Sequence, residues 1–209
     1  MTEYARSERL ALADEMARLG PDAPTLCTGW TTRDLAAHIV VRERRPDAAL
    51  GIAVKAAAGR TRQVQQQVAA QDFPALLDRV RRPPVWSLVS NPLLDEALNL
   101  NEMFVHHEDV RRAQPGWSPR PLDPRLQAAL WTRLRRMARL VLRRIPAVVV
   151  LDAGEYGAVT AGSGGARVTV FGDPGELSLF LTGRQAYARV RLDGDEAAIA
   201  KLTTARLGV

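Results

Sequence analysis

The residues best suited to chemistry in this sequence are its histidines and one glutamate. The chain has three histidines, His38, His106 and His107. Glu102 and His106 are four residues apart in a segment with helical periodicity, so their side chains should stand on one helix face. A carboxylate and an imidazole placed in this way can bind one metal ion together. His107 should point about 100° away from His106, which favours a solvated or supporting residue over a ligand.

His38 is the third candidate ligand and belongs to a different expected helix. It lies beside Leu35 and Ile39 on an apolar face. Glu102 follows Leu98 by one turn, on a face that is also largely apolar. Buried polar groups without partners are costly, and one shared metal ion would satisfy both imidazoles and the carboxylate. Three such ligands leave the fourth zinc position to water or a substrate atom, as in catalytic zinc sites.

Zinc is the first expectation, but nickel, manganese and iron(II) suit the same donors. Two interpretations need no metal. His38 could be a core histidine bonded to a carbonyl, and Glu102 with His106 could be a helical pair worth a few tenths of a kcal/mol. The residue pattern alone leaves all of these open.

Helical periodicity predicts the elements that position these side chains. The expected helices cover residues 2–19, 32 to beyond 44, 47–72, 73–82, 92–113 and 124–145. Thr31 with Asp34 resembles a capping box at the start of the second helix. Asp34 could instead orient His38 from one turn away.

After Pro146 the apolar period changes from about 3.6 to 2, which predicts strands. Strands are expected in AVVVLDA, YGAVTAG, ARVTVFG and ARVRLDG, and helices in GELSLFLTGR and after Asp195. The expected fold class is α+β, with a helical bundle over residues 1–146 followed by a small, mostly antiparallel α+β module over 147–209.

Composition narrows the class of protein. The net charge is +6, but it comes from scattered arginines with acidic neighbours, and aromatic residues are only 5%. That distribution disfavours a nucleic-acid surface. No segment approaches the roughly 20 apolar residues of a membrane span, and a single cysteine excludes an intrachain disulfide. We expect a cytoplasmic monomer or homodimer with neither nucleic acid nor membrane as partner.

Three further features have two interpretations each. Cys27 precedes a helix N-terminus, which would lower its thiol pKa and make it reactive, although packing beside Leu26 and Trp30 is more common. Arg184 could bind a substrate carboxylate or act only as a favourable charge at a helix end. The arginines of the RERRPD segment are expected in an ion-pair surface rather than a substrate clamp; they are Arg42, Arg44 and Arg45.

Two segments carry a family resemblance. APTLCTGWTTRDLAAHIVVRERRPDA resembles the opening segment of the mycothiol-dependent maleylpyruvate isomerase family, and NEMFVHHEDVRRA resembles its metal-helix segment. That family belongs to the DinB-like metal-binding four-helix bundles and is typical of actinobacteria. His38 matches its histidine on the second helix, and Glu102 and His106 match its pair spaced by four. FGDPGELSLFLTGR and VRLDGD resemble its C-terminal module, which is similar to sterol-carrier-like domains.

The resemblance implies metal-dependent thiol chemistry on a small, acidic molecule, in a thiol transferase or isomerase that uses mycothiol. The thiol would occupy the open metal position as a thiolate, and Arg184 would contact the substrate anion. A non-catalytic metal-binding or stress-related protein is the alternative, and nucleic-acid binding through arginine surfaces is the third.

Overall fold

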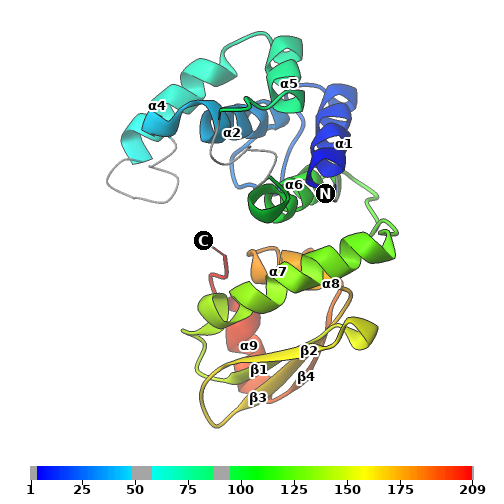
Figure 1. Cartoon of the computed structure of the whole chain (residues 1–209). Helices are drawn as coiled ribbons and strands as arrows, with labels where there is room; N and C mark the ends of the chain where they lie inside the picture. The colour runs from blue at the N-terminus through cyan, green and yellow to red at the C-terminus, as the bar shows by residue number, and fades with distance from the viewer. Residues whose placement is uncertain (1–3, 49–57, 87–94, 209) are drawn as a thin grey trace. The chain divides into compact units, whose positions relative to one another are not determined.

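The structure is a computed structural model that describes residues 4–48, 58–86 and 95–208, without the side chains of residues 95–98. The expected place of Leu98 on the ligand face therefore lies outside the described residues. The chain divides into two compact units, residues 1–118 and 119–209. The first is helical, and the second combines helices with a four-stranded sheet (Figure 1). The expected mixed α+β class is confirmed.

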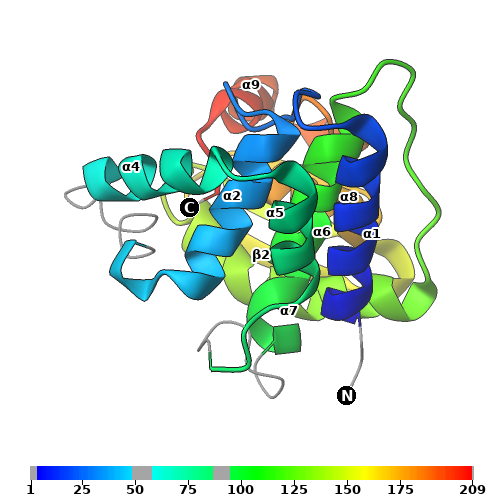
Figure 2. The same ribbon diagram turned by 90° about the horizontal axis from the view of Figure 1, so that it is seen from above.

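In the first unit, α5 lies between α1 and α2 and contacts both. The described helices are α1 (Tyr4–Leu19), α2 (Thr32–Arg44), α4 (Ala58–Ala69), α5 (Phe73–Arg81) and α6 (Asp95–Arg112). α1 also runs against α6, and α2 runs against α4 (Figure 2). Each helix falls within a segment predicted from periodicity, although residues 49–57 of the expected 47–72 helix lie outside the described part.

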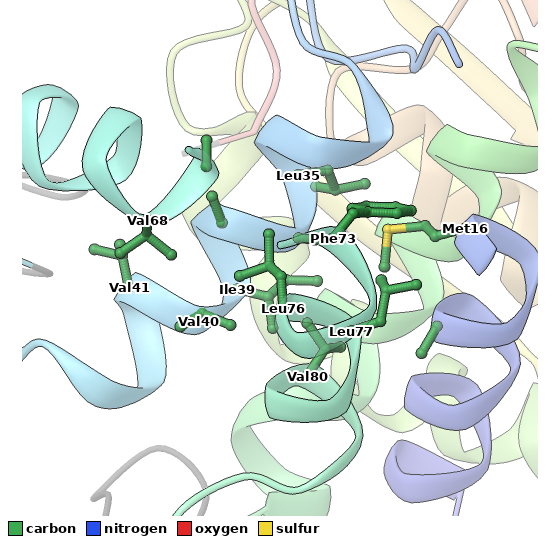
Figure 3. Close-up of a cluster of buried hydrophobic side chains, with 14 of the residues drawn as sticks. Met16, Leu35, Ile39, Val40, Val41, Val68, Phe73, Leu76, Leu77 and Val80 are labelled. Carbon is green, nitrogen blue, oxygen red and sulfur yellow. The ribbon is translucent and has the colours of Figure 1, made fainter. Parts of the chain in front are cut away.

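Apolar side chains from three of these helices meet in one core. Met16 of α1, Ile39 of α2 and Leu76 of α5 are fully buried and converge in Figure 3. Burial of each such side chain contributes about 1.5–3 kcal/mol. Because Ile39 is anchored here, the preceding residue His38 is turned by about 100° around the helix, away from this core.

The start of α2 is fixed by its own first turn. The Thr31 backbone N–H and hydroxyl both donate to Oδ2 of Asp34, at 3.0 and 2.9 Å. Asp34 is therefore a helix cap, the first of the two roles expected for it. The cap determines where α2 begins, and so where His38 lies along it.

A buried ion pair joins α1 to α2. Nη2 of Arg9 lies 2.6 Å from Oε1 of Glu43, and Nη1 lies 2.9 Å from Oε2. Nη1 also donates to the Val80 carbonyl at 3.1 Å, at the end of α5. Both charged side chains are 1% exposed, so this two-pronged contact holds three helices in register inside the unit.

The second unit is a sheet with helices on one face. Its elements are α7 (Pro124–Leu142), β1 (Val148–Asp152), a 3-10 turn η2 (Gly154–Tyr156), β2 (Ala158–Gly162), β3 (Arg167–Phe171), α8 (Pro174–Leu181), β4 (Arg191–Gly194) and α9 (Glu196–Thr204). The strand order is β2-β1-β3-β4. The outer pairings are antiparallel, as expected, whereas β1 and β3 in the centre are parallel.

α7 belongs to the second unit and not to the bundle. It packs against α8 and β2, and its Leu134 shares a core with Val149 of β1 and Val168 of β3. The division therefore falls after Ser118, earlier than the boundary near residue 146 expected from the sequence. The change of period at Pro146 marks where helix gives way to strand, but the apolar stripe of α7 covers the sheet that follows.

Candidate metal centre

The structure brings the predicted ligands His38, Glu102 and His106 together between α2 and α6. Oε1 of Glu102 lies 3.5 Å from Nε2 of His38 and 3.3 Å from Nε2 of His106. The donor atoms of all three lie within 4.8 Å of one another. Zinc bonds of about 2.0–2.1 Å at tetrahedral angles would place such donors about 3.3–3.4 Å apart. The spacing therefore fits three donors around one ion.

Burial differs among the three side chains. His38 and His106 are each 8% exposed, whereas the Glu102 side chain is 30% exposed. The Trp30 ring covers His38, with centroids 5.0 Å apart. The imidazoles are thus largely shielded from solvent, whereas the carboxylate is partly exposed, which gives an ion a way in.

The surroundings shift the pKa values of these groups in different directions. Burial lowers the pKa of His38, and its bond to Glu102 offsets this only in part. Burial alone would raise the pKa of Glu102, but the hydrogen bonds from His106 and His38 outweigh it and hold that pKa well below its ordinary value. Burial also opposes the charged form of His106, yet the contacts with Asp109, Cys27 and Glu102 raise its pKa well above the usual range. Without a metal, His106 holds a proton that an ion must displace.

Asp109 is a site residue that the sequence reasoning missed. Its Oδ2 lies 2.9 Å from Nδ1 of His106, and the residue is fully buried. A carboxylate that accepts the Nδ1 proton fixes the ring and leaves Nε2 for a metal, as carboxylate–histidine–metal arrangements do. The signal was present in the sequence, because Asp109 follows His106 by three residues on the same helix.

Cys27 lies on the Asp109 side of the same imidazole. Its thiol donates to Oδ2 of Asp109 at 3.2 Å, and Sγ lies 4.0 Å from Nδ1 of His106. The backbone N–H of Leu26 donates to the Asp109 carbonyl at 3.0 Å, which ties this loop to α6. Cys27 is half-buried and packs with Trp30 against the bundle core, so the packing role expected for it is confirmed. Its reactivity stays a prediction.

Arg42 stands one turn after His38 and contacts the same carboxylate. Its Nε lies 3.5 Å from Oε1 of Glu102, and Nη1 donates to Oδ1 of Asn99 at 2.5 Å. Arg42 is thus part of an ion pair between helices, as expected. Arg45 pairs locally with Asp47. Arg42 also places a positive charge beside Glu102, which helps to keep that carboxylate ionised.

His107 has a different partner from its neighbour. Its Nδ1 lies 2.9 Å from Oε2 of Glu8 on α1, and both side chains are buried. The expectation that His107 might be solvated is therefore wrong. As predicted, the helical phase points His107 away from the face that carries Glu102 and His106. Its side chain points toward α1 and is not exposed to water.

Arg184 belongs to the second unit, just after α8, whereas the three ligands belong to the first. Its guanidinium donates to the carbonyl of Thr182. This contact agrees with a role at the end of the helix. Its expected contact with a substrate anion stays a prediction.

Comparison with known proteins gives no family. No protein-family model, curated protein or solved structure matches the chain. Among the residues that the structure describes, no helix is both long and apolar enough to cross a membrane. The function therefore has to be argued from the site.

Proposed function

We propose that this protein binds one divalent metal ion, zinc in the first instance, through His38, Glu102 and His106, and uses it for thiol chemistry on a small, acidic molecule. The geometry of the site supports the metal-binding part of the proposal, and the family resemblance supports the thiol chemistry. Donor atoms from two helices lie at the separations that one ion requires, and a buried carboxylate orients one of the imidazoles from behind.

A catalytic site is favoured over a closed structural one. Three protein donors would leave a tetrahedral ion one open position, and the 30% exposure of the Glu102 side chain supports access of solvent to it. A bound zinc ion supplies Lewis acidity and makes a coordinated thiol a thiolate at neutral pH. This is the chemistry that the resemblance to mycothiol-dependent isomerases implies.

The chain's own residues have distinct roles in this proposal. Asp109 keeps the His106 proton on Nδ1, so that the Nε2 lone pair faces the ion. Trp30 covers the His38 ring and excludes water from it. Arg42 balances the charge of Glu102.

The family assignment is part of the same proposal. We infer a DinB-like bundle with a sterol-carrier-like C-terminal module, acting with mycothiol as a thiol transferase or isomerase. The separately packed helical unit and the mixed α+β unit support this arrangement. The two N-terminal segments that carry the resemblance include all three proposed ligands.

A non-catalytic metal-binding role is the second candidate. Two observations favour it: both imidazoles are more than nine-tenths buried, and Arg42 already occupies space beside Glu102. Such a protein would bind the ion in the same way but would show no response to thiols.

Metal loading tests the common part of both candidates. The full chain, stripped with chelator and dialysed against zinc, should retain about one ion per chain. His38→Ala, Glu102→Ala and His106→Ala should each lose tight binding while keeping their helical circular dichroism. Retention of less than about 0.1 ion per chain by the reloaded wild-type protein would refute the site.

A further inference from the structure

Both ring nitrogens of His106 face a set of metal-binding donors. On the Nε2 side lie Glu102 and His38, the proposed metal centre. On the Nδ1 side lie Oδ2 of Asp109 at 2.9 Å and Sγ of Cys27 at 4.0 Å. The donors of this second group also lie within 4.8 Å of one another. The second group differs from the first in containing sulfur.

We propose that Cys27, Asp109 and Nδ1 of His106 form a second ion site, selective for thiophilic divalent ions such as Cd²⁺ and filled as an alternative to the first. The inference goes beyond the proposed function, because the second site needs neither His38 nor any reaction at the first. Thiolate sulfur prefers soft ions, whereas the nitrogen and carboxylate donors of the first site accept a wider range.

The geometry is close to that of a bound ion. Zinc, the reference ion here, forms bonds of about 2.3 Å to sulfur and 2.0–2.2 Å to nitrogen and oxygen, and at tetrahedral angles these separate the donors by about 3.3–3.6 Å. The separation between Sγ and Oδ2 is 3.2 Å, that between Nδ1 and Oδ2 is 2.9 Å, and that between Sγ and Nδ1 is 4.0 Å. Each differs from the tetrahedral value by no more than about 0.5 Å, a change that side-chain rotation can supply.

The main chain that carries Cys27 is anchored independently of the contacts of the sulfur. The Leu26 N–H bonds to the Asp109 carbonyl at 3.0 Å, and the Cys27 N–H bonds to Oγ1 of Thr25 at 3.2 Å. A thiol is a weak hydrogen-bond donor, so orienting Asp109 does not by itself require sulfur at this position. The Cys27 thiolate and the Asp109 carboxylate together would also neutralise the charge of a divalent ion bound between them.

The two sites share one imidazole, and a neutral imidazole offers a lone pair at only one of its nitrogens, so the sites are alternatives. An ion in the second site replaces the thiol proton of Cys27 and the Nδ1 proton of His106, and both protons pass to solvent. The ring keeps its other proton on Nε2, where Oε1 of Glu102 at 3.3 Å can accept the hydrogen bond. With Nε2 protonated, the first site loses a ligand. An ion in the first site requires the opposite tautomer, with the proton on Nδ1 facing Asp109.

The single cysteine makes the test specific, because any thiolate-to-metal absorption in thiol-free buffer must come from Cys27. The metal-free full chain is titrated with Cd²⁺ and followed in the ultraviolet. We expect a charge-transfer band that saturates at one Cd²⁺ per chain in both wild type and His38→Ala. Cys27→Ser should lose the band and bind Cd²⁺ at least about tenfold more weakly, yet bind Zn²⁺ within about threefold of wild type.

A competition experiment tests exclusivity. Protein loaded with one equivalent of zinc is titrated with Cd²⁺ beside a zinc indicator, and the band should grow in step with released zinc. No band in wild type or in His38→Ala, or a band unchanged in Asp109→Asn, would overturn the second site. A band without zinc release would overturn the exclusive occupancy. Zinc binding by Cys27→Ser, and its loss when His38→Ala is added to Cys27→Ser, report on the first site separately, because both variants lack the sulfur of the second site. Helical circular dichroism checks that each variant is folded, and Cys27→Ala serves as a second sulfur-free variant.

Discussion

Oδ2 of Asp109 lies 2.9 Å from Nδ1 of His106, on the edge of the ring that faces away from Glu102. One helix, α6, thus carries two proposed ligands and the carboxylate that orients one of them. Because residues 102, 106 and 109 follow the 3.6-residue period, the helix itself sets their spacing. Mutation of the ligand His106 and mutation of the orienting residue Asp109 should therefore have different effects on metal binding.

Asp109→Asn should weaken zinc binding by about 10–100-fold, the usual effect of removing the partner of a metal-bound histidine. The amide keeps the size of the side chain but can present its NH₂ group to Nδ1, which disfavours the required tautomer. Isothermal titration calorimetry would measure the affinity. Asp34→Asn is the matched control, since it alters the α2 cap without touching His106. Equal zinc affinities in the two variants would contradict the orienting role.

The adjacent histidines should give opposite phenotypes. His106→Ala should abolish tight zinc binding, whereas His107→Ala should keep it and lower the free energy of unfolding by about 1–3 kcal/mol, because it removes the buried partner of Glu8. Metal analysis and chemical denaturation would separate the two effects. Loss of metal from both variants, with folding intact, would show that the assignment by helical phase is wrong.

Zinc binding should release a proton at neutral pH. The pKa of His106 is raised well above its usual range in the metal-free protein, so this ring is protonated at pH 7 and must lose a proton to bind zinc. The pKa of Glu102 is lowered and that of His38 is lowered, so neither group adds a proton at this pH. The affinity for zinc should therefore fall as the pH falls. The fall should begin at a pH above about 6.5, the ordinary pKa of histidine. Calorimetry in buffers of different ionisation enthalpy should show the release of about one proton per zinc ion bound. If no proton is released, His106 is not protonated in the metal-free protein.

Thiol binding should be visible with cobalt(II) in place of zinc. In the Cys27→Ser background, where no protein thiol can contribute, mycothiol or a simple analogue should produce a sulfur-to-cobalt absorption band that grows with thiol concentration. The band should be absent in Glu102→Ala, which fails to hold the ion. A fully loaded protein that shows no spectral change at millimolar thiol would leave the non-catalytic candidate as the better account.

Helical phase indicated that Glu102 and His106 share one face and that His38 lies on an apolar face of another helix, and the family resemblance implied that the three meet. The contribution of Cys27 was not predictable in the same way. It depends on how the loop before α2 folds back onto α6 through the bond from Leu26 to the Asp109 carbonyl, a contact between residues 83 positions apart. Periodicity describes each element alone, and it does not specify which surface a loop will lie against.

The same distinction explains the boundary between the two units. The amphipathic pattern of α7 was evident in the sequence, but an apolar stripe does not identify its partner. Leu134 and Leu142 pack with the strands that follow, so the helix joins the sheet. Only tertiary packing could place this helix with the second unit instead of the first.

The ion pair between Arg9 and Glu43 has a practical consequence for fragment studies. α1 supplies no proposed ligand, yet a fragment that starts at α2 would leave Glu43 and His107 without Arg9 and Glu8. Loss of one partner from a buried ion pair such as Arg9–Glu43 costs about 3–5 kcal/mol, a large part of the roughly 5–15 kcal/mol that stabilises a typical domain. The smallest fragment able to hold the metal should therefore begin before α1, even though every donor atom lies beyond residue 26.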